Sequence, residues 1–414
     1  MNTDMNRCDT SPLLGYQEAL EQLTRSVGAR GGMVEKPLLQ ALGAVLAESI
    51  ESQIDVPGCA MSAMDGYAVN TADLGAQGTT TLPLSQRIAA GSVAQPLAPG
   101  TAARIFTGAP VPPGADAVIM QEQVQQQAGS ISFESRPANG NNIRPAGNDI
   151  RRGTTILSKG CRLRAQDIGL AASIGLQSLP VFAPLKVGIF FTGDELVEPG
   201  EKLAPGKIYD SNRYTLCGLL EAMGCEIVDL GLVGDTLEAT REAMSGAATQ
   251  ADLVVTTGGV SVGEEDHVRI AIEQLGELRL WRLGIKPGKP LAYGQINDTA
   301  FMGLPGNPVP VFATFCLFVC PVIQIMQGRQ WRKPIALQVT ADFDWPKPDS
   351  RREFLRARLT TDAGQQTRVQ IYPNQDSGVL TSTVWADGFV EIAENQTVRA
   401  GDSVNYLPFA QFLD

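Results

Sequence analysis

The chain has 414 residues, of which 43% are hydrophobic and 19% are charged. A chain of this length and composition is expected to divide into two to four globular domains rather than to remain disordered. Its 44 acidic residues outnumber its 33 basic residues and give a net charge of −11, which argues against a general nucleic-acid binder that depends on neutralising phosphates.

Seven cysteines and one histidine limit the chemistry that the side chains can supply. The cysteines form no C-x-x-C pair and the N-terminus lacks an apolar signal segment, so we expect a reduced, cytoplasmic protein. Cys316 and Cys320 share one face of an apolar helical pattern, where packed thiols are commoner than a metal site. Because His267 is the only histidine, a His-rich zinc site is excluded.

Helical and β-rich patterns succeed each other in the first part of the chain. Apolar residues recur at helical spacing over residues 16–27 and 37–49, and Pro37 suits a first helical turn. From Asp55 onward, short Val/Ile-rich runs are separated by Pro-Gly and Gly-Ala-Pro turns, which is typical of a small β-rich module. A further helical pattern begins at Ala165.

These changes of pattern predict four domains. The β-rich module, residues 55–142, is inserted into a helical N-terminal and linker domain made of residues 12–54 and 143–181. An α/β domain covers residues 182–329. Short alternating strand patterns predict a C-terminal β-barrel over residues 330–414.

The α/β domain carries the clearest periodicity. Buried strand patterns alternate with helical patterns of 11–14 residues, over residues 211–223, 236–249 and 265–275. This alternation predicts three layers, with a mostly parallel sheet covered by helices on both faces and ligands bound at the carboxyl ends of the strands.

One uncharged segment in this domain, residues 299–328, is long enough to raise the question of a membrane span. Pro308, Pro310 and Pro321 interrupt it, and the preceding strand and helix pattern is that of a soluble domain. We therefore expect a buried helix, and no membrane partner.

Three predicted strands are followed by carboxylates. Glu195 follows the first, Asp235 the second, and Glu264, Glu265 and Asp266 the third. Acidic side chains at one rim of a sheet, beside an anionic ligand, favour a bound Mg²⁺. The alternative is that these acids only cap or begin the following helices.

A glycine-rich turn, residues 258–263, joins the third strand to its helix and would point backbone amides at an anion. Glu264 stands where a Walker-type phosphate loop requires lysine, so that kind of nucleotide site is excluded. Two rigid turns, residues 285–290 and 303–308, follow. Turn chemistry explains their prolines and glycines, whereas Lys286 and Lys289 favour a docking site for an oxyanion.

Taken together, several segments resemble the molybdopterin molybdenumtransferase family, which includes the E domain of gephyrin. The resemblance spans nearly the whole chain. It is carried by residues 55–58, 62–68, 107–110, 192–195, 258–263, 285–290 and 303–308.

This resemblance implies a Mg²⁺-dependent transferase whose substrates are molybdate and adenylylated molybdopterin and whose products are molybdenum cofactor and AMP. The implied catalytic residues are acidic: Asp65, Asp149, Glu195, Asp235 and Asp266. Of these, Glu195, Asp235 and Asp266 are the expected metal ligands. The implied ligand-binding residues are Thr107, Gly258, Gly259, Ser261, Gly263, Lys286, Lys289, Pro290, Pro305, Pro308, Arg351 and Ser377.

The family also implies a homodimer, in which Asp65 of one subunit faces the α/β domain of the other. A molybdopterin adenylyltransferase and molybdoenzymes are candidate protein partners, whereas nucleic acid is not.

The chain departs from the family pattern at two positions. Asn148 stands where a glutamate is usual, and Asp376 stands where a glycine is usual. The carboxylate of Asp376 would oppose oxyanion binding unless it points away or is paired.

Two other functions fit part of the pattern. One is adenylylation of molybdopterin, the preceding reaction, and the other is a non-catalytic scaffold that binds the cofactor. The choice between molybdate and tungstate stays open.

Overall fold

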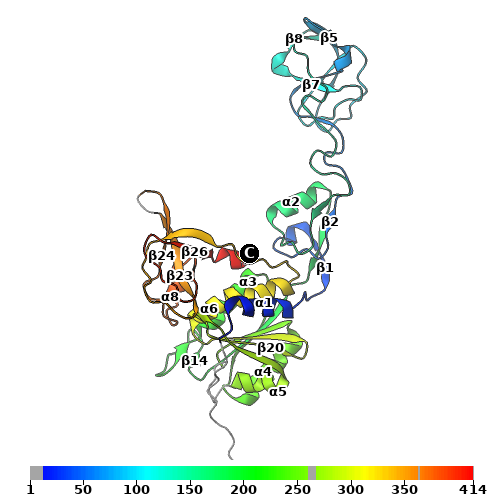
Figure 1. Cartoon of the computed structure of the whole chain (residues 1–414). Coiled ribbons are helices and arrows are strands. Elements are labelled where there is room, and N and C mark those ends of the chain that lie inside the picture. Colours follow the sequence, from blue (N-terminus) through cyan, green and yellow to red (C-terminus); the bar gives the residue numbers. More distant parts are fainter. Residues whose placement is uncertain (1–12, 260–266, 362–363, 414) are drawn as a thin grey trace, which may run out of the picture.

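The computed structural model of the chain describes residues 13–259, 267–361 and 364–413 (Figure 1). An α/β domain and the C-terminal region lie together at one end of the molecule. The β-rich module lies at the other end, and a small unit that contains β1, β2 and α2 separates the two ends (Figure 1).

The α/β domain is built on a six-stranded sheet in the order β16-β13-β17-β21-β20-β18. Only β20 runs against its neighbours, so the sheet is mostly parallel, as predicted. Its strands are β16 (Glu226–Val233), β13 (Lys186–Thr192), β17 (Leu253–Thr257), β21 (Thr299–Leu304), β20 (Pro290–Ile296) and β18 (Gly276–Arg282).

Helices cover both faces of this sheet, which explains why its strands are continuously apolar. Ile189 and Phe191 of β13 pack toward one set of helices, and Phe190 packs toward the other. The first set is α1 (Tyr16–Ser26), α3 (Ser211–Ala222), α6 (Pro308–Thr314) and α7 (Cys320–Met326). The second set is α4 (Leu237–Gln250) and α5 (His267–Leu275). Full burial of one Phe side chain stabilises the fold by about 2 kcal/mol.

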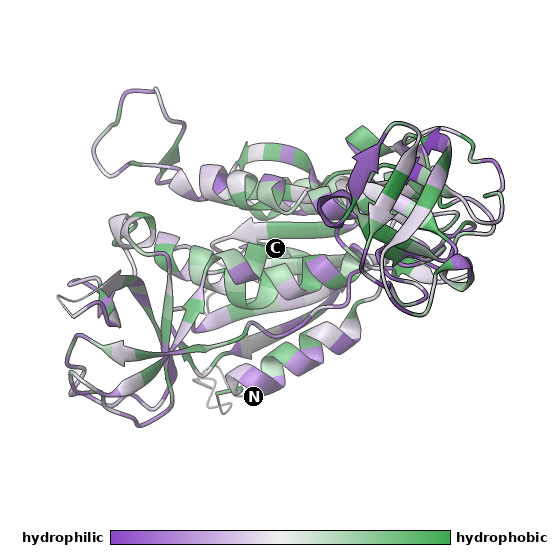
Figure 2. Ribbon diagram, turned by 90° about the horizontal axis from the view of Figure 1, so that it is seen from above, coloured by the Kyte–Doolittle hydropathy of each residue, from purple (hydrophilic) through white to green (hydrophobic). Residues whose placement is uncertain are grey.

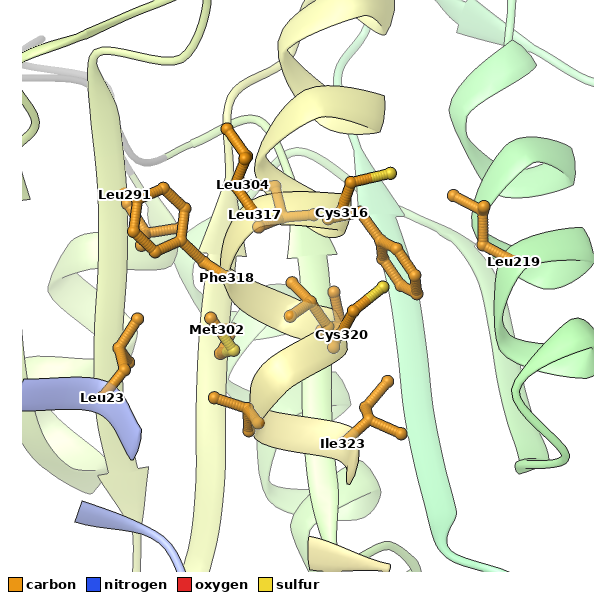
Figure 3. Close-up of a cluster of buried hydrophobic side chains, with 14 of the residues drawn as sticks. Leu23, Leu219, Leu291, Met302, Leu304, Cys316, Leu317, Phe318, Cys320 and Ile323 are labelled. Atoms are coloured by element: carbon orange, nitrogen blue, oxygen red, sulfur yellow. The ribbon is translucent and has the colours of Figure 1, made fainter. Parts of the chain in front are cut away.

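The uncharged segment Pro308–Met326 forms α6, a π-helical turn (Phe315–Val319) and α7. Among the described residues, it is the one helix long and apolar enough to cross a membrane, but 89% of its apolar window is buried inside the protein. Figure 3 shows its side chains between Leu23 of α1 and Leu219 of α3, against the sheet residues Leu291 and Met302. The prediction of a buried helix is confirmed.

Cys316 and Cys320 lie within this core (Figure 3). Burial raises the pKa of the Cys320 thiol well above its usual value. Their surroundings are apolar, and no group of three or more metal-ligating side chains occurs in the part of the chain that the structure describes. Both residues therefore act as packed thiols.

Helix α1 packs on the α/β domain, although the sequence assigned its residues to the N-terminal domain. Tyr16 makes edge-to-face contacts with Phe318 and Phe354 at centroid distances of 5.6 and 5.2 Å. In Figure 2 the helix beside the label N alternates hydrophobic and hydrophilic residues, as expected when one face of α1 is buried.

The helix predicted over residues 37–49 is wrong. Only a 3-10 turn, Leu38–Gln40, forms there, and Leu39 and Leu42 are exposed. Gly43 has a positive φ of 77°, which a continuing helix does not allow. The chain then pairs Leu46 with Val181 in an isolated β-bridge, because tertiary contacts outweigh the local helical pattern.

The unit between the two ends therefore contains more β-structure than predicted. It contains one helix, α2 (Ala165–Ser173), and two small antiparallel sheets. These pair β1 (Met33–Pro37) with β12 (Ser178–Phe182), and β2 (Ile50–Glu51) with β11 (Thr155–Leu157).

The β-rich module contains a second six-stranded sheet, in the order β7-β4-β6-β5-β9-β8. Its strands are β7 (Ala117–Met120), β4 (Gly66–Val69), β6 (Ala102–Ile105), β5 (Thr80–Ile88), β9 (Ser130–Phe133) and β8 (Gln125–Gln127). At its base, β3 (Met61–Ser62) pairs with β10 (Ile143–Arg144).

The C-terminal region forms the predicted β-barrel. Five strands close on themselves because β23 pairs with both β24 and β25. They are β22 (Leu337–Ala341), β23 (Arg352–Thr361), β24 (Thr367–Ile371), β25 (Gly388–Ile392) and β26 (Ser403–Pro408). The short helices α8 (Thr381–Trp385) and α9 (Ala410–Leu413) flank them.

Two further pairings tie loops of the α/β domain in place. β14 (Leu196–Val197) pairs with β15 (Ile208–Tyr209) beside the end of β13. β19 (Ile285–Lys286) joins the barrel sheet in parallel with β23. The second pairing connects the lysine-bearing turn directly to the barrel.

Candidate active site

The carboxyl ends of β17 and β21 form the floor of the candidate site. Gly258 and Gly259, directly after β17, have positive φ values of 79° and 62°, a conformation that glycine adopts without strain. Gly258 donates its amide N–H to the carbonyl of Leu304, with an N···O distance of 3.0 Å. Ser261, Gly263 and Asp266 lie outside the described residues, so their predicted roles stay predictions.

A cavity of about 480 Å³ opens beside this floor. Its lining comes from the glycine turn, the two rigid turns and two segments of the barrel. The structure thus brings together the predicted residues Gly258, Gly259, Lys286, Lys289, Pro290, Pro305, Arg351 and Ser377. Pro308 does not line the cavity but begins α6 beside it.

The lysine-bearing turn packs closely against the start of the uncharged segment. A Cβ on Gly288 would lie 2.6 Å from Cγ2 of Thr314 in α6, so a larger residue would displace the turn. The amide N–H of Leu283 donates to the carbonyl of Lys289, with an N···O distance of 2.7 Å. These contacts hold Lys286 and Lys289 at the cavity wall.

Two of the three cations at this wall, Lys286 and Arg351, form salt bridges with carboxylates of the barrel region. Nζ of Lys286 lies 2.8 Å from Oε1 of the buried Glu353 and 3.4 Å from Oδ2 of Asp349. Arg351 donates from two nitrogens to Asp349, at 3.0 and 2.8 Å. The Arg351 guanidinium holds the pKa of Asp349 well below its usual value, so this carboxylate stays ionised in acid solution.

Lys289 differs from its neighbours. Within the described residues, it belongs to no salt bridge, and it is exposed. Its positive charge is therefore the most available one for an incoming anion.

Arg356 holds the loop that carries Asp376 and Ser377, and the sequence did not predict this role. Its side chain is only 1% exposed and donates to Oγ of Ser382 at 3.0 Å and to the carbonyl of Asp376 at 3.2 Å. Burial lowers the pKa of Arg356 to about 10. The sequence of β23 did not single it out, because the same strand also carries Arg352 and Arg358.

Asp376, one of the two departures from the family pattern, lines the cavity. Its Oδ1 accepts the amide N–H of Gly378 at 2.9 Å. The carboxylate is exposed and belongs to no salt bridge in the described part of the chain. It therefore adds a negative charge to the wall that carries Lys289.

Two of the predicted metal ligands, Glu195 and Asp235, each lie beside the end of β13. Oδ1 of Asp235 accepts a hydrogen bond from the Thr192 hydroxyl at 2.9 Å. The Glu195 carboxylate lies so close to Gly193 that an added Cβ would be 2.7 Å from Oε2. Asp235 does not cap α4, because Thr236 does so, and the capping alternative is thereby excluded for Asp235.

The remaining predicted site residues lie on the arm of the molecule, which is formed by the β-rich module and the unit that carries it. The amide and hydroxyl of Thr107 both donate to Oδ1 of Asp65 at 2.8 Å, and these bonds lower the pKa of Asp65. Asp149 is exposed and lies where the chain returns from the β-rich module. In Figure 1 that module is far from the α/β domain and the barrel, whose residues line the cavity. One chain therefore does not bring Asp65 and Thr107 to Lys289.

Family models match three consecutive parts of the chain. Residues 14–175 match the MoeA N-terminal region (domain I and II), residues 188–325 match a probable molybdopterin binding domain, and residues 338–409 match the MoeA C-terminal region (domain IV).

Curated relatives match over most of their own length. A molybdopterin molybdenumtransferase of Haemophilus influenzae is 41% identical over 91% of this chain and 94% of the relative. A molybdopterin molybdenumtransferase 2 of Mycobacterium tuberculosis is 34% identical over 87% of this chain and 90% of the relative.

Among solved structures, the molybdopterin biosynthesis moeA protein of Pyrococcus horikoshii OT3 superposes with a TM-score of 0.84. It is 31% identical to this chain, and the match covers 96% of this chain and 100% of that structure. The multidomain fold is therefore shared over nearly the whole length.

Proposed function

Because this chain belongs to the molybdopterin molybdenumtransferase family, we propose that it inserts molybdate into adenylylated molybdopterin and releases AMP. The observation that supports this most is the single cavity that joins Gly258, Lys289 and Ser377 from two domains. Its size suits a small-molecule ligand.

The cavity wall supports a role in binding the oxyanion. Lys286 and Arg351 are held by Asp349 and Glu353, so they enter the reaction already oriented. Lys289 is exposed, and no carboxylate of the described residues forms a salt bridge with it. Its positive charge is therefore available to the anion. We assign molybdate to the space between Lys289 and the Ser377 loop, which Arg356 holds through its hydrogen bond to the carbonyl of Asp376.

We further propose that Mg²⁺ binds at Glu195, Asp235 and Asp266. Carboxylate oxygens are suitable ligands for Mg²⁺, and Glu195 and Asp235 both lie at the end of β13. Mg²⁺ bound there would neutralise charge on the diphosphate of the substrate. The protein's own contribution is to hold the two carboxylates in place, Asp235 through its hydrogen bond with Thr192.

A homodimer is part of the same proposal. Asp65 and Thr107 belong to the β-rich module, which lies away from the α/β domain and the barrel of its own chain (Figure 1), so a second copy must supply them if they act there. Asp149, near the base of the arm, is assigned the same kind of role. We also propose a cytoplasmic location and a division into four domains, residues 12–54 with 143–181, 55–142, 182–329 and 330–414.

The test is a reconstitution with purified protein, adenylylated molybdopterin, Mg²⁺ and molybdate. We expect release of AMP together with active cofactor, and loss of both when EDTA removes Mg²⁺. ATP consumption without molybdate would instead identify an adenylyltransferase, and binding without turnover would identify a scaffold. Tungstate competition in the same assay measures the choice of metal.

Replacing Asp376 with asparagine is expected to lower the KM for molybdate by about threefold. Asparagine still accepts the Gly378 N–H, so the turn is kept while one negative charge leaves the cavity wall. Steady-state kinetics at low and high salt measure the effect, which should shrink as salt screens it.

Asp344→Asn is the matched control for this substitution. Asp344 accepts the Ala400 N–H at 3.0 Å in another turn of the barrel region and does not line the cavity. An equal KM change in both variants would show that the overall charge, and not the charge of Asp376 at the wall, is responsible.

A further inference from the structure

Two arginines lie side by side on the β-rich module. Arg87 of β5 and Arg104 of β6 are direct partners in a parallel pairing, so their side chains leave the same face of the sheet. Tyr67 of β4 is the partner of Arg104 on its other side. The three residues form a row across neighbouring strands.

Aromatic rings hold both guanidinium groups. Arg104 lies 5.0 Å from the ring centroid of Tyr67 and 4.7 Å from that of Phe106. Arg87 lies 4.5 Å from the same Phe106 ring. Such contacts favour the cation but do not neutralise its charge.

Hydrogen bonds fix Arg104 further. It donates to the carbonyl of Gly66 at 3.1 Å and to Oε1 of Gln121 at 2.6 Å. Neither arginine belongs to a salt bridge among residues 13–259, 267–361 and 364–413. Arg87 is exposed, and Arg104 is partly exposed.

This arrangement is costly unless an anion joins it. Two like charges on neighbouring strands repel each other. The Arg104 charge helps to lower the pKa of Asp65, and Glu122 is linked to Arg104 only through Gln121, which donates to Glu122 at 3.2 Å. Neither carboxylate forms a salt bridge with Arg87 or Arg104 in the described part of the chain, so both guanidinium groups stay available to an anion, although the whole chain carries −11. The module therefore presents a local site for a negative group beside Asp65 and Thr107.

We propose that Arg87 and Arg104 bind a phosphate group, specifically a phosphate of the adenylylated substrate or of the AMP product. Planar guanidinium groups present several N–H donors to phosphate oxygens. The inference rests on the proposed function, because it requires the Asp65 end of the module to meet the cavity of a second copy. The two arginines would contact the nucleotide part of the substrate, a contact that the glycine turn and Lys289 do not supply.

The test compares Arg87→Gln with Arg136→Gln, which removes an exposed arginine elsewhere on the same module. AMP binding to the full-length protein is measured by calorimetry, and KM is measured separately for adenylylated molybdopterin and for molybdate. For Arg87→Gln we expect about tenfold weaker AMP binding and a similar rise in the KM for adenylylated molybdopterin, with the KM for molybdate unchanged. Arg136→Gln should match the wild type, and Arg87→Lys should fall between.

Several results would overturn the inference. Unchanged AMP binding in Arg87→Gln would do so, and so would a rise in the molybdate KM alone. Conversion of this variant to monomers, seen by sedimentation, would show that Arg87 pairs with a carboxylate of the partner subunit instead. If wild-type protein binds AMP through Arg87 but does not turn over, the proposed function fails while the phosphate site stands.

Discussion

Replacing Asp65 with asparagine is expected to lower the rate of molybdenum transfer by roughly 100-fold. The two hydrogen bonds from Thr107 keep Asp65 ionised below the usual pH range of an aspartate. Asparagine preserves an acceptor for both bonds and removes only the charge. The variant should therefore stay folded and accumulate adenylylated molybdopterin, which chromatography of the reaction mixture would detect.

The control for this substitution is Asp73→Asn in the same module. Oδ2 of Asp73 accepts the Gly100 N–H at 2.7 Å, so it is also a carboxylate that holds a turn. Asp73 has no assigned part in the reaction. Equal losses in the two variants would contradict a specific role for Asp65.

Mixing two inactive variants tests whether the site is shared between subunits. Each variant by itself should turn over slowly. Asp65→Asn lacks the carboxylate of the β-rich module, and Lys289→Met lacks the positive charge at the cavity wall. After subunit exchange, half the dimers are mixed and each has one intact site, so activity should return to roughly one quarter of the wild-type value. No recovery, with exchange verified, would show that Asp65 does not act across a dimer.

Replacing Gly66 with alanine is expected to destabilise the β-rich module by about 3 kcal/mol or more. Gly66 begins β4 and pairs with Met120 of β7. An added Cβ would lie 1.9 Å from the carbonyl oxygen of Ile119 and 2.9 Å from its carbonyl carbon. Because both atoms are backbone, the two strands must separate, and Asp65 loses its position.

Limited proteolysis and hydrogen exchange measure this effect within residues 55–142. We expect faster cleavage and exchange there, with the α/β domain unchanged. Gly75→Ala is the control, since a Cβ at Gly75 would meet nothing closer than 3.8 Å. If Gly66→Ala is as stable as this control, the predicted strand clash is wrong.

Sequence periodicity predicted the elements whose pattern is local. The continuous apolar runs of β13 and β17 and the glycines after β17 identified a mostly parallel sheet with a binding rim. The same reasoning failed for residues 37–49. There, apolar spacing resembled a helix, but Gly43 and the bridge from Leu46 to Val181 favoured an extended path.

The candidate site was predictable in part, for the same reason. Lys286 and Lys289 stood out because two cations on one proline-rich turn are unusual, and the family motif added Arg351 and Ser377. The sequence did not indicate that Asp349 and Glu353 compensate Lys286 and Arg351. The pairing of β19 with β23 brings Lys286 to Asp349 and Glu353, which lie more than 60 residues later in the chain.

The sequence by itself determined the acidic balance, the order of the domains, the family and most of the residues that line the cavity. Those properties depend on composition, on short-range periodicity and on motifs. Only the tertiary structure decided which cations keep a free charge, that Arg356 holds the Ser377 loop through the carbonyl of Asp376, and that Arg87 and Arg104 lie side by side. Electrostatic interactions depend on distance in space and on burial, and neither follows from separation along the chain.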